Sequence, residues 1–256
     1  MDNENKAQKK GFISLWVVFV LLVLTKLSKQ LSGGGLPGLE VMVWSAALSV
    51  FLLIKSGIPS KRGLTVSGVL TLLVVLSGLA GGCGALEMVL FTILTALSSL
   101  AVISVSEKTE DVKLIRAADK KSVLISVLIG AAVAVPLAVV NTLANTEGTM
   151  APVFSVERIF RAVKPGISED MAFRALFMAF CVYLTKNKMS KWQVFTMYVM
   201  MTLPHGLMHN MGILSCVMCS IIFGIPFSLL QRKRDITSAM VSHFAVDAVR
   251  FIIFGG

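Results

Sequence analysis

Three clusters of ionisable side chains in the last third of the chain have the residue types needed for acid–base chemistry. They lie in the stretches ISEDMAFRALFMAF (167–180), LPHGLMHN (203–210) and SHFAVDAVRF (242–251), each of which is otherwise mostly apolar. The candidate site residues are Glu169, Asp170, Arg174, His205, His209, His243 and Asp247. Carboxylate and imidazole groups commonly activate water or carry protons near neutral pH. The clusters therefore predict a site for general acid–base catalysis.

The two acids of the first cluster, Glu169 and Asp170, are expected to have different roles. Ser168 is expected to cap the N-terminus of a helix, whose positive end would tolerate Glu169 and Asp170 in the first turn. Arg174 lies one turn deeper and is expected to pair with Asp170, four residues before it. Glu169 points about 100° around the helix from Asp170. We therefore predict that Glu169 is the carboxylate left free to act as a base.

The other two clusters hold all three histidines of the chain. His205 and His209 are four residues apart, as are His243 and Asp247, so each pair is expected to share one helix face. Pro204 is expected to kink its helix just before His205. A lone histidine in a membrane helix often only links two helices by a hydrogen bond. Three clusters with this composition favour a functional site instead.

Composition shows what kind of protein must position these groups. The chain has 256 residues, of which 55% are hydrophobic and 15% charged, with mean hydropathy +0.82. Soluble domains have about 25% charged residues. We expect an all-α, polytopic bundle of about eight or nine transmembrane helices, near residues 12–28, 39–54, 64–80, 88–106, 123–141, 168–184, 193–209, 211–230 and 236–254. A charge at a helix centre costs roughly 2.5–3.5 kcal/mol, so the polar groups are expected to converge.

The basic residues that give the net charge of +10 lie mainly in the predicted loops of this bundle. Most of the 24 Lys and Arg residues fall in alternate loops, which predicts a cytoplasmic N-terminus in a cell-membrane protein that contacts lipid and binds no nucleic acid. The five cations of the opposite side are Lys26, Lys29, Arg158, Arg161 and Lys164. The first apolar segment is expected to be a retained span, because no small-residue cleavage site follows it.

The chain is expected to have three parts. Residues 1–141 form a transmembrane scaffold, 142–167 an interfacial amphipathic loop, and 168–256 the catalytic transmembrane helices. In the loop, apolar residues at 3-4-3 spacing predict a short amphipathic helix ended by Pro165 and Gly166. These apolar residues are Val153, Val156, Phe160 and Val163.

The order of the three clusters resembles the motifs of the CPBP family, the CAAX prenyl proteases and bacteriocin-processing (ABI-type) enzymes. In that family the motifs read E-E-x-x-x-R, F-x-x-x-H and H-x-x-x-N. The resemblance covers about residues 165–250. This chain departs from it with Asp170 for the second Glu, Met201 for the aromatic residue before His205, and Asp247 for the final Asn.

The resemblance implies an intramembrane glutamate endopeptidase that needs no cofactor. Glu169 with His205 would activate water, and His243 helped by Asp247 would stabilise the oxyanion. Asp170 and Arg174 would hold the helix and Glu169 in place, and His209 is expected, from its position beside His205, to be a further supporting residue. The substrate would be a peptide bond near the C-terminus of a prenylated CAAX-type protein, or one in a bacteriocin or other peptide precursor.

Three alternatives remain open. Glu169, His205 and His243 could form a two-His, one-carboxylate site for a divalent metal such as zinc. Buried acids and histidines also suit a proton-coupled transporter, although the polar groups are confined to one half of the chain. Finally, a carboxylate at Asp247 would repel an oxyanion, so the chain could be an inactive binding relative of the family.

Overall fold

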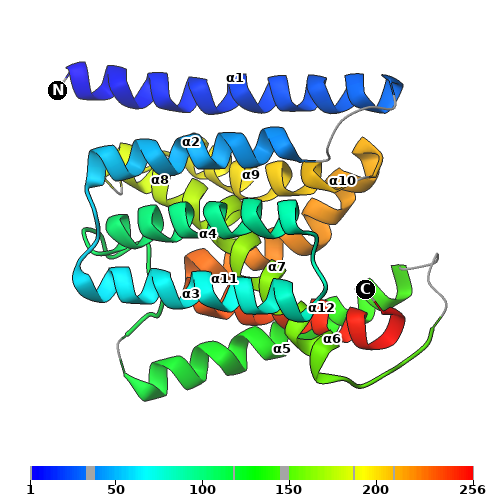
Figure 1. Ribbon diagram of the computed structural model, residues 1–256. Coiled ribbons are helices and arrows are strands. Elements are labelled where there is room, and N and C mark those ends of the chain that lie inside the picture. Colours follow the sequence, from blue (N-terminus) through cyan, green and yellow to red (C-terminus); the bar gives the residue numbers. More distant parts are fainter. Residues whose placement is uncertain are drawn as a thin grey trace.

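The fold is a bundle of helices. The computed structural model describes residues 2–32, 38–117, 119–144, 150–186, 188–209 and 211–255, and these include no strand. The elements are α1 (Asp2–Ser32), α2 (Leu39–Ser56), α3 (Lys61–Ala80), α4 (Ala85–Ser106), α5 (Lys120–Ala144), α6 (Val156–Arg161), α7 (Val163–Glu169), η1 (Asp170–Ala175), α8 (Leu176–Thr185), α9 (Lys191–Met208), α10 (Ile213–Cys219), η2 (Ser220–Gly224), α11 (Ile225–Lys233) and α12 (Ile236–Phe254). The long helices run side by side, and their connections lie at the two ends of the bundle (Figure 1).

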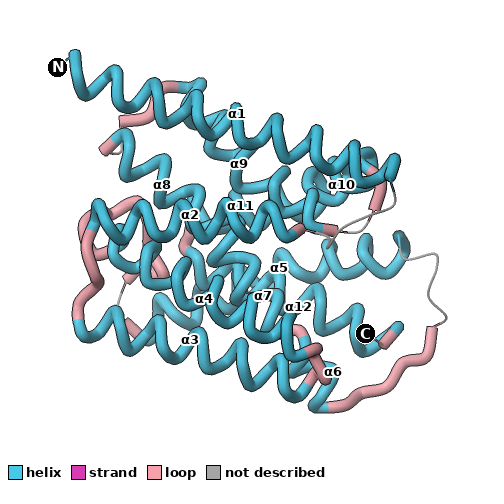
Figure 2. The backbone as a smooth tube through the Cα atoms, turned by 45° about the horizontal axis from the view of Figure 1, so that its top comes forward, coloured by secondary structure: helices cyan, strands magenta, loops and turns pink. Residues whose placement is uncertain are grey.

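Seven of the described helices are long and apolar enough to cross a membrane. They are α1, α2, α3, α4, α5, the continuous α10–η2–α11 and α12. The remaining long helices, α7–η1–α8 and α9, lie among them (Figure 2). Every side chain from Met171 to Ala179 is at most 1% exposed. The expected all-α, multi-pass membrane bundle is confirmed, and one of its central helices carries the buried Asp170 and Arg174.

The side chains are distributed as a lipid environment requires. Large apolar side chains point outward, with Ile54 74% and Leu143 75% exposed. Small hydroxyl residues fill the contacts between helices, as where the Oγ atoms of Ser67 on α3 and Ser99 on α4 lie 2.5 Å apart. Helices in membranes associate through such small residues because burying apolar surface gains little there.

The helix that carries the first cluster begins earlier than expected. Ser168 does not cap it: the Ser168 Oγ donates to the carbonyl of Lys164 at 2.6 Å, one turn back within α7. Pro165 and Gly166 do not end a helix either, because they lie in the first turn of α7, where proline needs no backbone donor. A Cβ on Gly166 would meet the Cβ of Phe244 at 3.0 Å, so α7 and α12 cross closely here.

The loop before α7 also differs from expectation. Val153 lies in an extended segment whose backbone N–H donates to the carbonyl of Ile252 at 2.9 Å. The helix α6 starts only at Val156, after Ser155, whose Oγ accepts from the Arg158 N–H at 3.1 Å. The predicted helix is therefore wrong at both ends, because contacts with α12 hold the first apolar residues extended. Residues 145–149 of this loop lie outside the described part of the chain.

α9 continues past Pro204 as far as Met208, and His209 follows it with an extended backbone (φ −71°, ψ 143°). His205 and His209 therefore do not share a helix face as predicted, although their rings remain close. A Cβ on Gly206 would lie 2.7 Å from the carbonyl oxygen of Cys216. Only glycine lets the end of α9 approach α10 this closely.

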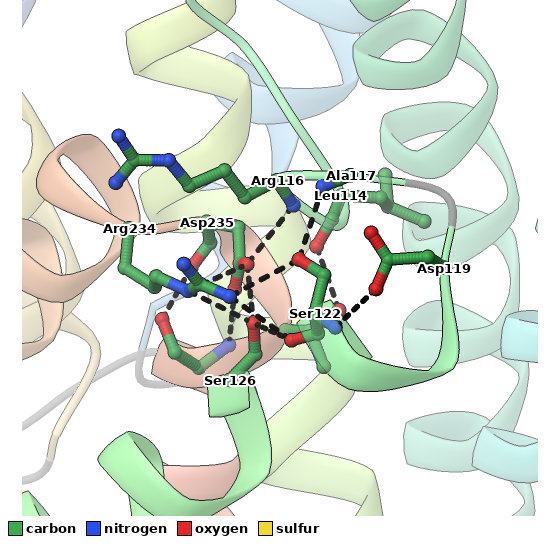
Figure 3. A network of polar contacts seen from close by, with 10 residues as sticks. Leu114, Arg116, Ala117, Asp119, Ser122, Ser126, Arg234 and Asp235 are labelled. Atoms are coloured by element: carbon green, nitrogen blue, oxygen red, sulfur yellow. Dashed lines mark hydrogen bonds and ion pairs between the residues drawn. The ribbon is translucent and has the colours of Figure 1, made fainter. Parts of the chain in front are cut away.

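A network of polar contacts holds the start of α12 in place (Figure 3). It lies at the end of the bundle opposite to the end of α9 at Met208. The carboxylate of Asp235, whose side chain is fully buried, accepts hydrogen bonds from Ser238 N at 2.8 Å, Arg116 N at 3.1 Å and Ser126 Oγ at 2.5 Å. Arg234 Nε lies 3.5 Å from the same carboxylate. Asp235 thus joins α12 to α5 and to the loop before α5.

We expect Asp235→Ala to lower the free energy of unfolding by about 3 kcal/mol, because it removes a helix cap and leaves buried donors unpaired. Thermal unfolding in detergent would show this as a lower transition temperature. Asp119→Ala is the matched control, since exposed Asp119 only caps α5 by accepting from Ser122 N at 2.5 Å. Equal shifts for the two variants would contradict a structural role for the network.

Candidate active site

The three clusters meet at one cavity of about 1030 Å³. α7 supplies Glu169, η1 supplies Arg174, α9 supplies His205, and α12 supplies His243 and Asp247. The cavity is also lined by the α3–α4 connection at Gly81 and Gly82, so it lies toward that end of the bundle. Side chains as far apart in the sequence as Glu169 and Asp247 thereby line one cavity, within reach of one bound molecule.

Helical geometry explains how the first cluster reaches the cavity. The helix from α7 to α8 is continuous but widens at η1, where Leu176 N–H donates to the carbonyl of Met171, five residues back. Single π-helical turns inside α-helices occur frequently at functional sites. Here the wide turn holds Asp170 and Arg174, directly after Glu169.

Arg174 connects the whole site, although its side chain is only 1% exposed. Its Nη1 pairs with the Oδ1 of Asp170, as the spacing predicted. The same guanidinium also lies 2.7 Å from His205 Nδ1 through Nη2 and 3.2 Å from His243 Nδ1 through Nη1. The sequence predicted only the first of these contacts. Arg174 therefore orients two histidines as well as an acid.

The contact with Arg174 fixes the proton on His205. A guanidinium has only donors, so His205 Nδ1 must accept, and the imidazole is neutral with its hydrogen on Nε2. His205 Nε2 lies 2.6 Å from Glu169 Oε2 and donates to it. Glu169 accepts this hydrogen bond as a carboxylate, and its other lone pairs remain able to take a proton. The 16% of its side chain that is exposed faces the cavity.

His243 lies between two pairs of charged groups. Its Nδ1 is 3.4 Å from Asp170 Oδ2 and close to Arg174, while its Nε2 is 3.5 Å from Asp247 Oδ2 and 3.7 Å from Glu169 Oε2. Two carboxylates near Nε2 favour a hydrogen on that nitrogen. The N–H group is thus available to an oxygen atom that develops negative charge in the cavity.

His209 is the least engaged of the predicted residues. It lines the cavity, and its ring centroid lies 5.2 Å from that of His205. Its carbonyl accepts from Lys26 Nζ on α1 at 2.5 Å, which ties the first helix to the end of α9. His209 therefore borders the cluster of Glu169, His205 and His243 rather than belonging to it.

Two aromatic rings hold the histidines in place, and no sequence pattern pointed to either. Phe173 stacks on His205 with 5.9 Å between ring centroids and 8° between planes. Phe227 on α11 stacks on His243 at 4.9 Å and also lies 5.0 Å from Arg174 Cζ. In the sequence, a phenylalanine of an apolar helix cannot be assigned to a lipid-facing position or to a contact with a histidine ring.

The donor set does not suit the metal alternative. A metal between Glu169, His205 and His243 needs a lone pair on His205 Nε2, but the contact with Arg174 leaves the lone pair on Nδ1 and the hydrogen on Nε2. In the part of the chain that the structure describes, no three His, Cys, Asp or Glu side chains are arranged to hold a metal ion.

Comparison with known proteins gives one match. No match to the chain was found among curated proteins or among solved structures. Residues 151–249 match the family model described as Rce1-like, Type II CAAX prenyl endopeptidase. The matched segment holds all seven candidate site residues, and the resemblance predicted from the three motifs is confirmed. Over these residues, which are less than half of the chain, the protein is similar to the Rce1-like family of type II CAAX prenyl endopeptidases.

Proposed function

We propose that the protein is an intramembrane endopeptidase in which Glu169 activates a water molecule. Its substrate is a peptide bond near the C-terminus of a prenylated CAAX-type protein, or one in a bacteriocin or other peptide precursor. The observation that carries the proposal is the 2.6 Å contact in which His205 Nε2–H orients Glu169 at the wall of the cavity. Water that reaches this carboxylate can lose a proton to it.

The reaction then follows from the positions of the other groups. As Glu169 takes a proton from water, the oxygen attacks the carbonyl carbon, and the carbonyl oxygen becomes an oxyanion. The His243 Nε2–H donates to this oxyanion. When the intermediate collapses, the C–N bond breaks and Glu169 returns the proton to the leaving amine. Arg174 and Asp170 act as positioning residues, and His209 borders the site.

Asp247 is expected to act by orienting His243 rather than by its charge. Asp247→Asn should keep kcat within about threefold of the wild type, because an amide of the same size keeps a polar oxygen beside the His243 ring, where Asp247 Oδ2 lies 3.5 Å from Nε2. Asp247→Leu should lower kcat about tenfold, since it leaves the imidazole without this partner. Steady-state kinetics on both purified variants would check this. Equal losses would show that the negative charge itself is required.

The function is tested by giving purified protein in detergent a panel of prenylated and unprenylated peptides. Cleavage of a panel member supports the endopeptidase, and we expect it to survive exhaustive chelation. Activity that chelation removes and zinc restores would bring back the metal alternative. No cleavage, together with pH-dependent uptake into vesicles, would support the transporter instead.

The orientation in the cell membrane is part of the proposal. With a cytoplasmic N-terminus, the α3–α4 connection beside the cavity lies outside, so the site opens toward the outer leaflet. A cytosolic CAAX substrate needs the opposite orientation. Reporter fusions after residues 186 and 233 decide between them, because both positions lie on the side opposite to the cavity.

A further inference from the structure

The end of α1 holds the connection between α9 and α10, which forms one wall of the cavity. Lys26 Nζ donates to the carbonyl of His209 at 2.5 Å, and Gln30 Nε2 donates to the carbonyl of Met211 at 3.0 Å. His209 and Met211 line the cavity, whereas Lys26 and Gln30 are outside its lining. Two side chains of the first helix therefore hold a wall of the site without entering the cavity.

The end of α1 is itself anchored to its neighbours. Lys29, which lies on the same face of α1, pairs with Glu40 on α2. Just before α2, a Cβ on Gly38 would meet the Cα of Met208, the last residue of α9, at 3.0 Å. Because α1 is bound to α2 and the start of α2 lies against α9, the donors on α1 are supplied from a fixed support.

The wall is continuous with the turn that carries His205. α9 ends one turn after His205, at the C-cap residue His209. The last carbonyls of a helix lack donors within the helix, and a cation stabilises that end. Lys26 supplies a donor and a positive charge there. A Cβ on Gly206 would lie 2.7 Å from the carbonyl oxygen of Cys216, so α10 bounds the same turn from another side.

We infer that α1 is a positioning element of the active site. Through Lys26 it keeps the last turn of α9 formed, and so keeps His205 in contact with Glu169. The effect on catalysis rests on the proposed endopeptidase, whereas the support of the wall does not. α1 lies outside residues 151–249, which match the family model. A helix outside both the motifs and the family match thus takes part in the site.

The support of the wall is tested by thiol labelling. Cys216 on α10 is 1% exposed, and its Sγ lies 3.5 Å from the Met211 carbonyl, the same carbonyl that Gln30 binds. We expect it to react with N-ethylmaleimide when the wall opens. Two proteins with one cysteine each are compared. One keeps Cys216 and the other keeps Cys181, which is fully buried in α8, and the other three cysteines are replaced by alanine.

Lys26→Met should raise the labelling rate of Cys216 about tenfold to 100-fold, as for the loss of a hydrogen bond from a charged donor, and leave that of Cys181 unchanged. Gln30→Leu should raise it less. Lys26→Arg should stay near the wild type, because a guanidinium can donate to the same carbonyl. Lys10→Met is the matched control, since Lys10 is an exposed cation toward the other end of α1.

Cleavage kinetics test the effect on His205. Lys26→Met should lower kcat about tenfold and change KM by less than about threefold, because Lys26 is outside the cavity lining while His205 orients Glu169. Lys26→Arg should restore most of kcat, and Lys10→Met should match the wild type. All four proteins keep their native cysteines in this measurement.

Three results would overturn the inference. They are an unchanged labelling rate of Cys216 in Lys26→Met, equal increases for Cys216 and Cys181, and a loss of cleavage carried by KM with kcat unchanged. If Lys26→Met does not fold, Gln30→Leu decides by the same measurements. Failure of the endopeptidase itself looks different. In that case no protein cuts any peptide, while the labelling of Cys216 still depends on Lys26.

Discussion

Glu169→Gln is expected to lower kcat for peptide cleavage at least about 1,000-fold, since general bases contribute about 100-fold to 10,000-fold and, among the described residues, Glu169 is the carboxylate in contact with His205. The glutamine oxygen can still accept the hydrogen bond that His205 Nε2 donates to Glu169. The substitution therefore removes basicity while it keeps the contact. Single-turnover cleavage by purified protein measures the loss.

The control for this loss is Glu157→Gln. Glu157 is an exposed acid of α6 outside the cavity lining, so its loss should leave kcat unchanged. The thermal transition of Glu169→Gln should stay near that of the wild type. Cleavage by Glu169→Gln within tenfold of the wild-type rate would assign the base to another group.

Arg174→Met is expected to affect both stability and activity. The substitution leaves the buried carboxylate of Asp170 without its cation, which typically costs about 3–5 kcal/mol in free energy of unfolding. It also removes the donor to His205 Nδ1, so the imidazole can take either tautomer and Glu169 loses a defined hydrogen bond. Thermal unfolding and cleavage, measured on the same preparation, separate the two effects.

The double variant Asp170→Leu/Arg174→Met distinguishes stability from function. Replacing both members of a buried ion pair by apolar residues is often neutral or stabilising, so we expect the transition temperature to recover. Cleavage should remain absent, because His205 and His243 still lack Arg174. Recovery of activity in the double variant would mean that Arg174 acts only through its pair with Asp170.

Much of the fold was predictable because the length and position of each apolar run decide where a membrane helix lies. A membrane helix needs a run of apolar residues, and hydropathy locates such runs wherever lipid is the solvent. It failed at Val163–Ser168, where the helix extends past its apolar run into a segment with Lys, Pro and Gly. There the close crossing of α7 with α12, at Gly166 and Phe244, decides the start, and this is a tertiary contact.

Within the site, the sequence allowed prediction only of contacts between residues of the same helix. The pair of Asp170 with Arg174 follows from a spacing of four residues, and the structure has it. The bonds from Arg174 to His205 and His243 depend on where α9 and α12 cross η1, which no spacing along the chain encodes. For the same reason the tautomer of His205, on which the choice of base depends, required the structure.

Because of the wide turn η1, the site depends on the number of residues in this helix and not only on their types. It lies between Glu169 and the fully buried side chains at the start of α8, and it accommodates one residue more than a regular turn would. Removing one residue from 170 to 175 would let this turn close to a regular α-helical turn. The halves of the helix on either side would keep their faces, whereas the side chains inside the turn would change direction. A one-residue deletion is therefore expected to break the contacts of Asp170 and Arg174 while the buried face of α8 stays in place.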